Sequence, residues 1–235
     1  PRPGKGRVPY RHAARARRVK LSDAAERFGL VAAWVLVVIV FGALAPRTFL
    51  SQGNFATIFG SQAVLLVLTL GLLVPLTAGD YDVSIAGVLT LSAMIVAALN
   101  VNLGWPIGLA ILAALLAGAL VGVVNGGIVT LFGIDPLIVT LGTGTILSGV
   151  VLWISSSNTI SGVSTTLVNL VVGWRFLGIS LEFYYGLALV IVLWYLFEYT
   201  ALGRRILFVG RGRTVARLSG LRVRRLRVGA MVASG

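Results

Sequence analysis

Two aspartates, Asp80 and Asp82, interrupt a long apolar part of the chain, in the stretch PLTAGDYDVSIAG at residues 75–87. Ionisable side chains are costly in an apolar environment, so carboxylates in such a place are candidates for function. Pro75 and Gly79 predict that the preceding helix is broken there, because proline removes an amide donor and glycine permits a turn.

The residues alone support two interpretations of these carboxylates equally. In the first, Asp82 caps the next helix by accepting from the amide of Ser84 or Ile85, and Asp80 reaches water at the helix end. In the second, the broken helix lines a cavity, as in transporters, and the carboxylates hydrogen-bond a polyhydroxylated solute. Because Asp82 occupies a capping position, we expect it to support helix geometry, and Asp80 to be the more replaceable residue.

A second polar region begins at Asp135, which is followed by Pro136. Aspartate at the N-cap with proline at the first helical position is a strong signal for the start of a helix. The helix expected there carries the hydroxyl residues Thr140, Thr143, Thr145 and Ser148. We expect this face to contact protein or a pore, although Ser and Thr also bond back to carbonyls of their own helix.

The composition of the chain is that of a membrane protein. Of its 235 residues 57% are hydrophobic and only 11% are charged, whereas soluble domains average about 25% charged residues. The chain has no cysteine, one histidine (His12) and no G-x-x-x-x-G-K-[ST] phosphate-binding loop. Disulfides, thiolate catalysis and thiolate metal sites are therefore excluded, and we expect no enzyme, metal site or cofactor of its own.

The hydrophobic segments predict an all-α fold, a polytopic transmembrane helical bundle. About 20 apolar residues cross a bilayer core of roughly 30 Å. We expect six full spans and the start of a seventh near the C-terminal end, and hence a piece of a longer protein. The six spans are predicted at residues 28–45, 58–78, 83–99, 103–124, 137–154 and 183–199. In domain terms, we expect a basic N-terminal tail at residues 1–27 and a transmembrane domain at residues 28–235.

The charge distribution predicts the orientation of the chain. The net charge is +13, and 18 of the 20 Lys and Arg residues lie in residues 1–27 and 204–227. Basic clusters that flank apolar spans mark the cytoplasmic side and suit anionic lipid headgroups. We therefore expect a multi-pass protein of the cytoplasmic membrane with a cytoplasmic N-terminus, residues 155–180 outside, and no nucleic-acid partner.

Small residues recur every four positions along the fourth predicted span. This spacing places them on one helix face, where another helix can approach closely. Tight packing is the favoured interpretation, and a pore-facing or mobile helix contact is the alternative. The residues are Ala110, Ala114, Gly118, Gly122 and Gly126.

Three segments resemble, in the same order, the carbohydrate-type ABC importer permeases of the ribose, xylose and galactose group. LTAGDYDVSIAGVLTLSA is similar to their AG-x-x-D-L-S-V-G segment, and NGGIVTLFGIDPLIVTLGTGTILSGV to their segment with I-x-P-F-I-x-T-L-G-T. GRRILFVGRGRTVARLSGLRV resembles the cytoplasmic loop that docks on the ATPase. Departures from the family pattern are Ile85, Ala86, Gly212 and Thr214.

The resemblance implies a permease subunit of an ATP-driven importer for a monosaccharide or a similar small polar solute. It implies as partners a cytoplasmic ABC ATPase subunit, which binds the ATP, an external solute-binding protein, and a second permease copy in a homo- or heterodimer. The alternatives are a permease for nucleosides or branched-chain amino acids, and an ion-coupled secondary transporter that uses Asp80 or Asp82. A purely structural anchor is disfavoured by the polar residues within the spans.

Two sets of candidate site residues follow. The predicted translocation pathway comprises Asp80, Asp82, Ser84, Asn125, Thr140, Thr143 and Thr145. The predicted ATPase-coupling loop comprises Arg213, Thr214, Val215, Ala216, Arg217, Leu218, Ser219 and Gly220.

The coupling loop is predicted to form a short helix. Val215, Leu218 and Leu221 recur at a helical spacing and would form an apolar face for a groove on the partner, with Gly220 ending the helix. We expect Ala216→Glu to leave folding intact and to detach the ATPase.

Overall fold

The computed structural model describes the backbone of residues 12–235 and the side chains of residues 28–235. The chain divides into two compact units, Pro1–Phe55 and Ala56–Gly235, and each is described by itself. The predicted basic tail therefore lies largely outside the described residues, since only the backbone of residues 12–27 is described, as the first part of a helix.

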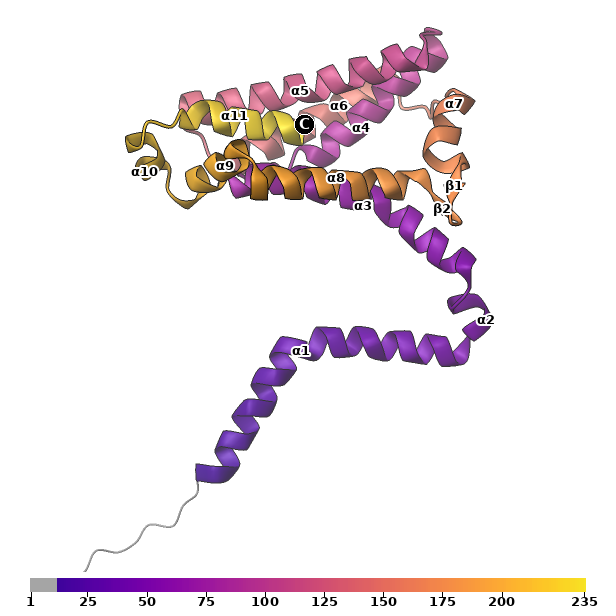
Figure 1. Ribbon diagram of the computed structural model, residues 1–235. Coiled ribbons are helices and arrows are strands. Elements are labelled where there is room, and N and C mark those ends of the chain that lie inside the picture. The colour runs from indigo at the N-terminus through magenta and orange to yellow at the C-terminus, as the bar shows by residue number, and fades with distance from the viewer. Residues whose placement is uncertain (1–11) are drawn as a thin grey trace, which may run out of the picture. The chain divides into compact units, whose positions relative to one another are not determined.

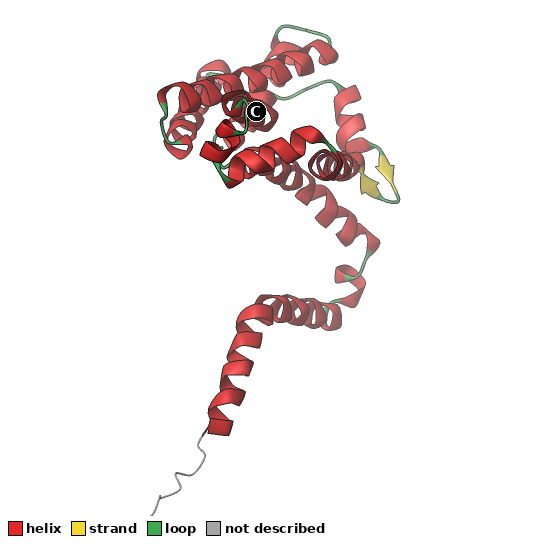
Figure 2. Cartoon of the chain, turned by 60° about the vertical axis from the view of Figure 1, so that its left-hand side comes forward, coloured by secondary structure: helices red, strands yellow, loops and turns green. Residues whose placement is uncertain are grey.

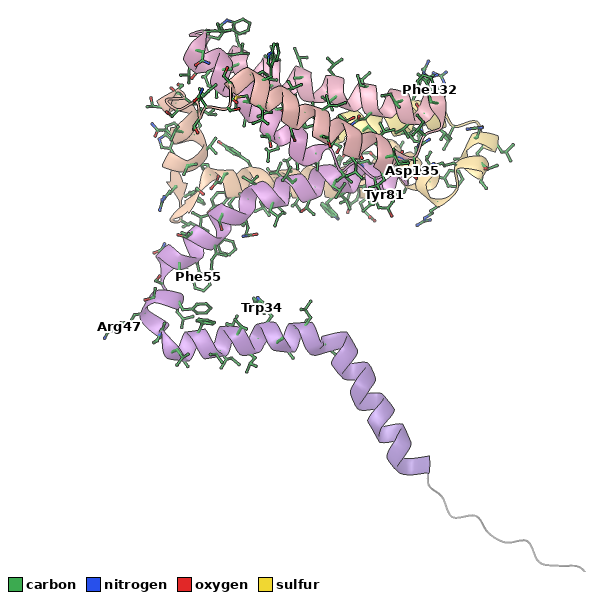
Figure 3. The ribbon with its side chains drawn as sticks, turned by 180° about the vertical axis from the view of Figure 1, so that it is seen from behind. Trp34, Arg47, Phe55, Tyr81, Phe132 and Asp135 are labelled. Carbon is green, nitrogen blue, oxygen red and sulfur yellow. The ribbon has the colours of Figure 1, made fainter. Side chains whose placement is uncertain are left out.

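The first unit contains α1 (His12–Leu44) and α2 (Pro46–Phe49). Pro46 is the first residue of α2, where its missing N–H costs nothing, so the first apolar segment ends at this proline as expected. The rings of Phe41 and Phe49 stack with centroids 5.8 Å apart and hold α2 against the end of α1. Trp34 on α1 is exposed, as a lipid-facing side chain would be (Figure 3).

Five helices within the described residues are long and apolar enough to cross a membrane. The first predicted span corresponds to the shorter apolar segment Phe28–Leu44. The fold is therefore that of a multi-span helical membrane protein with five long apolar helices and one shorter one (Figure 1). The long spans are α3 (Gln52–Thr77), α4 (Ile85–Ala97) with the π-helical turn η1 (Ala98–Asn102), α5 (Ile107–Phe132), α6 (Pro136–Ser155) and α8 (Leu181–Tyr199).

The predicted end of the fourth span differs from the structure. The span was expected to end at residue 124, whereas α5 continues to Phe132. Asn125, the first residue beyond the predicted end, is fully buried within the helix. Its amide is bonded to side chains of α6 and of the segment before α4, so a polar residue that looks like a helix terminus is tolerated in the interior.

Two predicted loops contain regular structure. The segment at residues 155–180 includes α7 (Thr165–Val168), η2 (Asn169–Gly173) and an antiparallel hairpin of β1 (Arg175–Phe176) and β2 (Ile179–Ser180), drawn yellow in Figure 2. Leu177 and Gly178 both have positive φ, as a two-residue hairpin turn requires. The basic segment after α8 folds into α9 (Ala201–Arg211), α10 (Arg213–Leu218) and α11 (Val223–Ser234), the last over the residues where the start of a seventh span is expected.

The small-residue face of α5 receives α11. A Cβ added at Gly126 would lie 2.9 Å from the Cα of Val228, and one at Gly122 would lie 2.6 Å from the Cα of Val232. A side chain at either position would thus collide with the backbone of α11. The close approach supports tight helix packing, the favoured interpretation of this face.

Helix α9 is fitted equally closely to the end of α3. Val74 and Ala78 form a buried cluster with Ile206 of α9 and Ala230 of α11. A Cβ added at Gly210 would collide with the carbonyl oxygen of Thr77. This contact holds the basic segment that follows α9 beside the break between α3 and α4. In Figure 1, α10 lies at the end of the second unit opposite α7 and the hairpin.

Candidate functional site

The break between α3 and α4 is a buried, polar segment. Asp80, Asp82 and Ser84 are all within 1% of complete burial. The amides of Ala78 and Asp80 donate to the carbonyl of Pro75, and Gly79 has a φ of 81°, a left-handed conformation that favours glycine. The predicted break is confirmed, and its two carboxylates face different partners.

Asp82 belongs to a chain of four hydrogen-bonded side chains, which we call the Asp82 network. The hydroxyl of Thr143 donates to Asn125 Oδ1 over 2.6 Å, and Asn125 Nδ2 donates to the hydroxyl of Ser84 over 2.9 Å. The Ser84 hydroxyl in turn donates to Asp82 Oδ1 over 2.5 Å. The network therefore ties the break to α5 and α6 through neutral donors.

Asp82 also accepts from the amide of Ser84, over 3.0 Å. This is one of the two bonds that the capping interpretation predicted. The N-cap position of α4 itself is Ser84, whose own side chain caps no helical amide. Asp82 thus stabilises the turn that leads into α4, and its burial is matched by hydrogen bonds to Oδ1.

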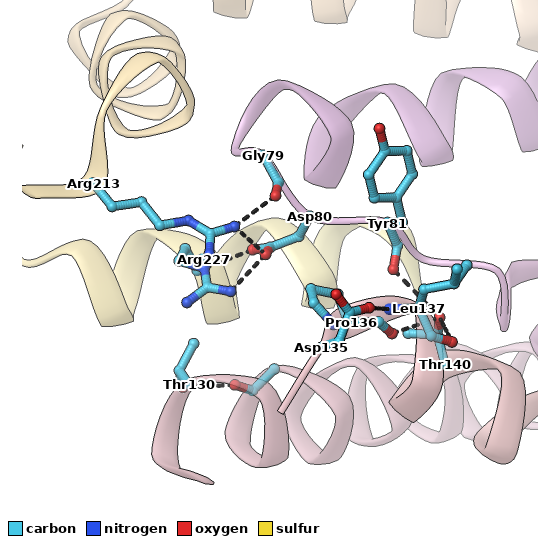
Figure 4. Close-up of polar contacts among 11 residues, drawn as sticks. Gly79, Asp80, Tyr81, Thr130, Asp135, Pro136, Leu137, Thr140, Arg213 and Arg227 are labelled. Atoms are coloured by element: carbon cyan, nitrogen blue, oxygen red, sulfur yellow. Dashed lines mark hydrogen bonds and ion pairs between the residues drawn. The ribbon is translucent and has the colours of Figure 1, made fainter. Parts of the chain in front are cut away.

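Thr140 fixes the same segment on α6. Its hydroxyl accepts from the amide of Val83 over 3.1 Å, donates to the carbonyl of Pro136 over 2.9 Å, and lies 3.3 Å from the carbonyl oxygen of Tyr81. At the start of α6, Asp135 Oδ1 accepts from the amide of Leu137 over 2.8 Å, so the predicted N-cap is confirmed (Figure 4). Figure 3 shows Tyr81 and Asp135 at the same end of the second unit.

The remaining hydroxyl residues of α6 behave differently. Thr145 and Ser148 are exposed and donate to the carbonyls of Leu141 and Gly144 within the same helix. The expected polar face therefore splits, because Thr140 and Thr143 contact protein while Thr145 and Ser148 bond back to α6.

Asp80 lies between two arginines, and we call these three residues the Asp80 cluster (Figure 4). Arg227 donates through Nε and Nη2 to the two carboxylate oxygens, over 2.7 and 2.5 Å. Arg213 Nη2 donates to Asp80 Oδ1 over 2.8 Å and to the carbonyl of Gly79 over 2.6 Å. The cluster joins the break to the first residue of α10 and to α11.

The expectation that Asp80 reaches water is wrong. Its side chain is 1% exposed, against 12% for Arg227 and 43% for Arg213. The arginines that cover it come from 133 and 147 residues further along the chain. Removing a partner from a buried ion pair leaves an uncompensated charge, so this geometry predicts instead that Asp80 is the less replaceable of the two aspartates.

Helix α10 has one buried and one exposed apolar side. Val215 is 58% exposed and Leu218 is 84% exposed, as the predicted docking face requires. Ala216 is fully buried in a cluster with Val209 and Val223. Gly220 follows the helix with a φ of 80°, which agrees with its predicted role in ending the helix.

The burial of Ala216 corrects one prediction. Ala216→Glu would place a carboxylate among apolar side chains of this chain, so it cannot leave folding intact. The other residues of the predicted coupling loop lie on the surface of α10 and its C-terminal turn. These are Arg213, Thr214, Arg217 and Ser219.

Arg227 and Gly210 were not identified from the sequence. Arg227 counts in the sequence only as one of many basic residues that mark orientation. Gly210 lies within the quoted segment GRRILFVGRGRTVARLSGLRV, but no role was predicted for it. Neither residue carries a local signal for its role, because each acquires that role by contact with the distant segment 77–80.

The described part of the second unit also contains an apolar groove of about 500 Å³ between α3, α4, α5, α8 and α11. Val88 and Leu193 are among the residues that line it, and Ser92 and Ser234 are its hydroxyl residues. None of the predicted translocation-pathway residues lines this groove. Among the described residues, no group of three or more His, Cys, Asp or Glu side chains could hold a metal ion.

The second unit thus combines long apolar helices, a broken helix with buried carboxylates and a basic segment docked on that break, and the protein is a helical membrane protein of several spans. The chain belongs to the family described as branched-chain amino acid transport system / permease component, whose sequence model matches residues 54–235. The resemblance to an ABC importer permease family is thereby confirmed.

Individual relatives agree with this assignment. Over 199 residues the chain is 31% identical to the D-allose transport system permease protein AlsC of Escherichia coli (strain K12), a match that covers 85% of this chain and 61% of AlsC. It is 31% identical over 209 residues to the fructose import permease protein FrcC of Rhizobium meliloti, covering 86% and 58%. It is 29% identical over 203 residues to the autoinducer 2 import system permease protein LsrD of Salmonella typhi, covering 83% and 60%.

The chain therefore spans about 60% of the length of these curated relatives. No solved structure matches it.

Proposed function

We propose that the protein is the permease subunit of an ATP-driven ABC importer in the cytoplasmic membrane. The observation that carries this proposal is helix α10, which is anchored by the buried Ala216 and presents Leu218, 84% exposed, on a segment rich in arginine. A short helix with an unburied apolar face suits a groove on a partner protein. The ATP-hydrolysing subunit is the partner that such a permease needs, and the permease itself hydrolyses nothing.

The proposed orientation places both arginine-rich regions, residues 1–27 and 204–227, on the cytoplasmic side. The support is the positive-inside rule, since these regions hold 18 of the 20 basic residues. The segment with α7 and the hairpin then faces outward, where the solute-binding protein would dock. A second copy of the permease, or a related chain, would complete the pathway.

The proposed solute is a monosaccharide or a similar small polar molecule. The names of AlsC and FrcC, which refer to D-allose and fructose, support this choice. The family description names branched-chain amino acids, which are the second candidate class. An ion-coupled transporter is less well supported, because both aspartates already have partners. Two arginines form ion pairs with Asp80, and Asp82 accepts a hydrogen bond from the hydroxyl of Ser84.

The proposal is tested with Leu218→Glu in the full-length permease, with Leu218→Met as the matched control. Leu218→Glu places a charge on the exposed apolar face and should reduce co-purification of the ATPase and ATP-driven uptake by at least about tenfold, since a buried interfacial charge without a partner costs several kcal/mol. Leu218→Met keeps an apolar side chain of similar volume and should behave as wild type.

Uptake is measured with labelled D-allose, fructose and leucine, in the presence and absence of a protonophore. Retention of the ATPase by Leu218→Glu with wild-type uptake would overturn the docking assignment. Uptake that stops with the protonophore while ATP remains available would favour the ion-coupled alternative.

A further inference from the structure

We propose that Asp80 and Arg213 are positioning residues that transmit movement of α10 to the break between α3 and α4. The inference rests on the proposed function, in which α10 docks on the ATPase, and it assigns a role that the docking face alone does not have. Arg213 is the first residue of α10, and its guanidinium reaches both Asp80 Oδ1 and the carbonyl of Gly79.

The contact between α10 and the break is closely packed on the side of α9. A Cβ added at Gly79 would lie 3.5 Å from Arg213 Nη2 and 3.6 Å from the Cα of Gly210. At Gly210 a Cβ would collide with the carbonyl oxygen of Thr77. A displacement of the α9–α10 segment must therefore move the end of α3 or break the contacts of Arg213.

The displacement would also reach α6. Residues 81–83 follow Asp80 directly, and Thr140 of α6 accepts from the amide of Val83. Two residues beyond Asp80, Asp82 is tied through Ser84 to α5. The segment 80–84 thus links the docking helix to the helices of the predicted translocation pathway.

The two arginines of the Asp80 cluster are suited to different roles. Arg227 binds both carboxylate oxygens, its side chain is 12% exposed, and α11 is fixed by close packing on α5. Arg213 uses a single nitrogen and is 43% exposed. Because Arg227 remains bound, Arg213 can leave without exposing Asp80 as an unpaired buried charge. Arg213 is therefore the exchangeable contact and Arg227 the permanent one.

The experiment follows hydrogen exchange of the amides of residues 79–84 in the full-length permease–ATPase complex, with and without a non-hydrolysable ATP analogue. In the wild type we expect nucleotide to change exchange in this segment roughly tenfold, as for a local opening that is shifted by binding. Arg213→Gln should abolish this response while α10 stays protected by the docked ATPase.

Conservative variants sharpen the test. Arg213→Lys should retain the response, because one ammonium group can supply the donors that a single guanidinium nitrogen supplies now. Arg227→Lys should not behave as wild type, because lysine cannot reproduce the two-pronged contact. Arg224→Gln, at an exposed position of α11 outside the predicted coupling loop, is the matched control and should leave the response unchanged.

Several outcomes would overturn the inference. The first is an unchanged nucleotide response at residues 79–84 in Arg213→Gln while α10 is still protected. The second is a wild-type complex in which the ATPase is docked but nucleotide has no effect on exchange at residues 79–84. If Arg213→Gln gives too little protein, Arg213→Met, which keeps the apolar stem without the charge, takes its place and is judged by the same result. Absence of protection of α10 in the wild-type complex would instead overturn the proposed function, and this inference with it.

Discussion

Asp80 and Asp82 are separated by one residue, and the protein compensates for the two buried carboxylates in different ways. Asp82 accepts from the hydroxyl and amide of Ser84, so its partners are neutral and come from the adjoining residues. Asp80 is held by two guanidinium groups from α10 and α11. One carboxylate is thus satisfied locally, while the other depends on a distant part of the chain.

The Asp82 network lies within a group of tightly packed helices, whereas the Asp80 cluster connects that group to another segment. The Asp82 network joins α5 and α6 to the start of α4, and a Cβ added at Gly87 of α4 would lie only 3.2 Å from the Cα of Gly144 of α6. These helices therefore form a tightly packed group. The Asp80 cluster crosses from that group to the segment that carries the exposed face of α10. The ion pairs of Asp80 therefore lie where the group of α4, α5 and α6 meets the α10 segment, whereas hydrogen bonds from neutral side chains hold the three helices together.

The largest expected effect comes from Asp80→Ala, which leaves two arginines facing each other without an anion. Arg227 is largely buried, so the variant should lose about 3–5 kcal/mol of stability, the usual cost of breaking a buried ion pair from one side. Thermal unfolding of the protein in detergent measures this loss. If Asp80→Ala unfolds no earlier than Asp82→Ala, the contrast between the two carboxylates is wrong.

Local signals in the sequence predicted a large part of this arrangement. Asp135 followed by Pro136 specifies the start of α6 by itself, and the apolar segments located all of the long spans, because both signals depend only on neighbouring residues. The fourth span was predicted to end at residue 124 for the same reason, since the hydrogen-bond partners that hold Asn125 inside the helix lie outside its own neighbourhood.

Contacts between distant segments could not be predicted in this way. Asp80 and Arg213 were both singled out, in different motifs, but nothing in either motif indicates that they pair across 133 residues. Ala216 was correctly placed on a short helix, yet which side of that helix is buried depends on Val209 and Val223 of the neighbouring helices. The sequence therefore identified the separate segments of the candidate site, and only the structure shows which of their residues contact each other.

A smaller effect is expected from Asp82, where substitution tests whether shape or charge matters. Asp82→Ala removes the acceptor for the hydroxyl and the amide of Ser84, which is fully buried, and should cost about 1–3 kcal/mol. Asp82→Asn keeps an oxygen in the same place and should cost less than about 1 kcal/mol. If Asn impairs transport as strongly as Ala while protein amounts stay normal, the negative charge itself is required.

The smallest effect separates the two kinds of hydroxyl on α6, and it is measured with the matched pair Thr143→Val and Thr145→Val. The two threonines lie on one helix, and the substitution removes the same hydroxyl while keeping the branched shape. Thr143 donates across helices to Asn125 Oδ1, which is buried and loses this donor in the variant. Hydrogen bonds between membrane helices contribute about 0.6 kcal/mol on average and roughly 1.7 at most, and Thr143→Val should lie in this range.

Thr145 donates only to the carbonyl of Leu141 in its own helix and is exposed. Bonds of this kind add little to helix stability, so Thr145→Val should change the free energy of unfolding by less than about 0.5 kcal/mol. Unfolding of both variants in the same detergent gives the comparison directly. Equal losses from the two would show that the Asp82 network adds nothing beyond the packing of α5 on α6, and the neutral half of the contrast with Asp80 would then have to be abandoned.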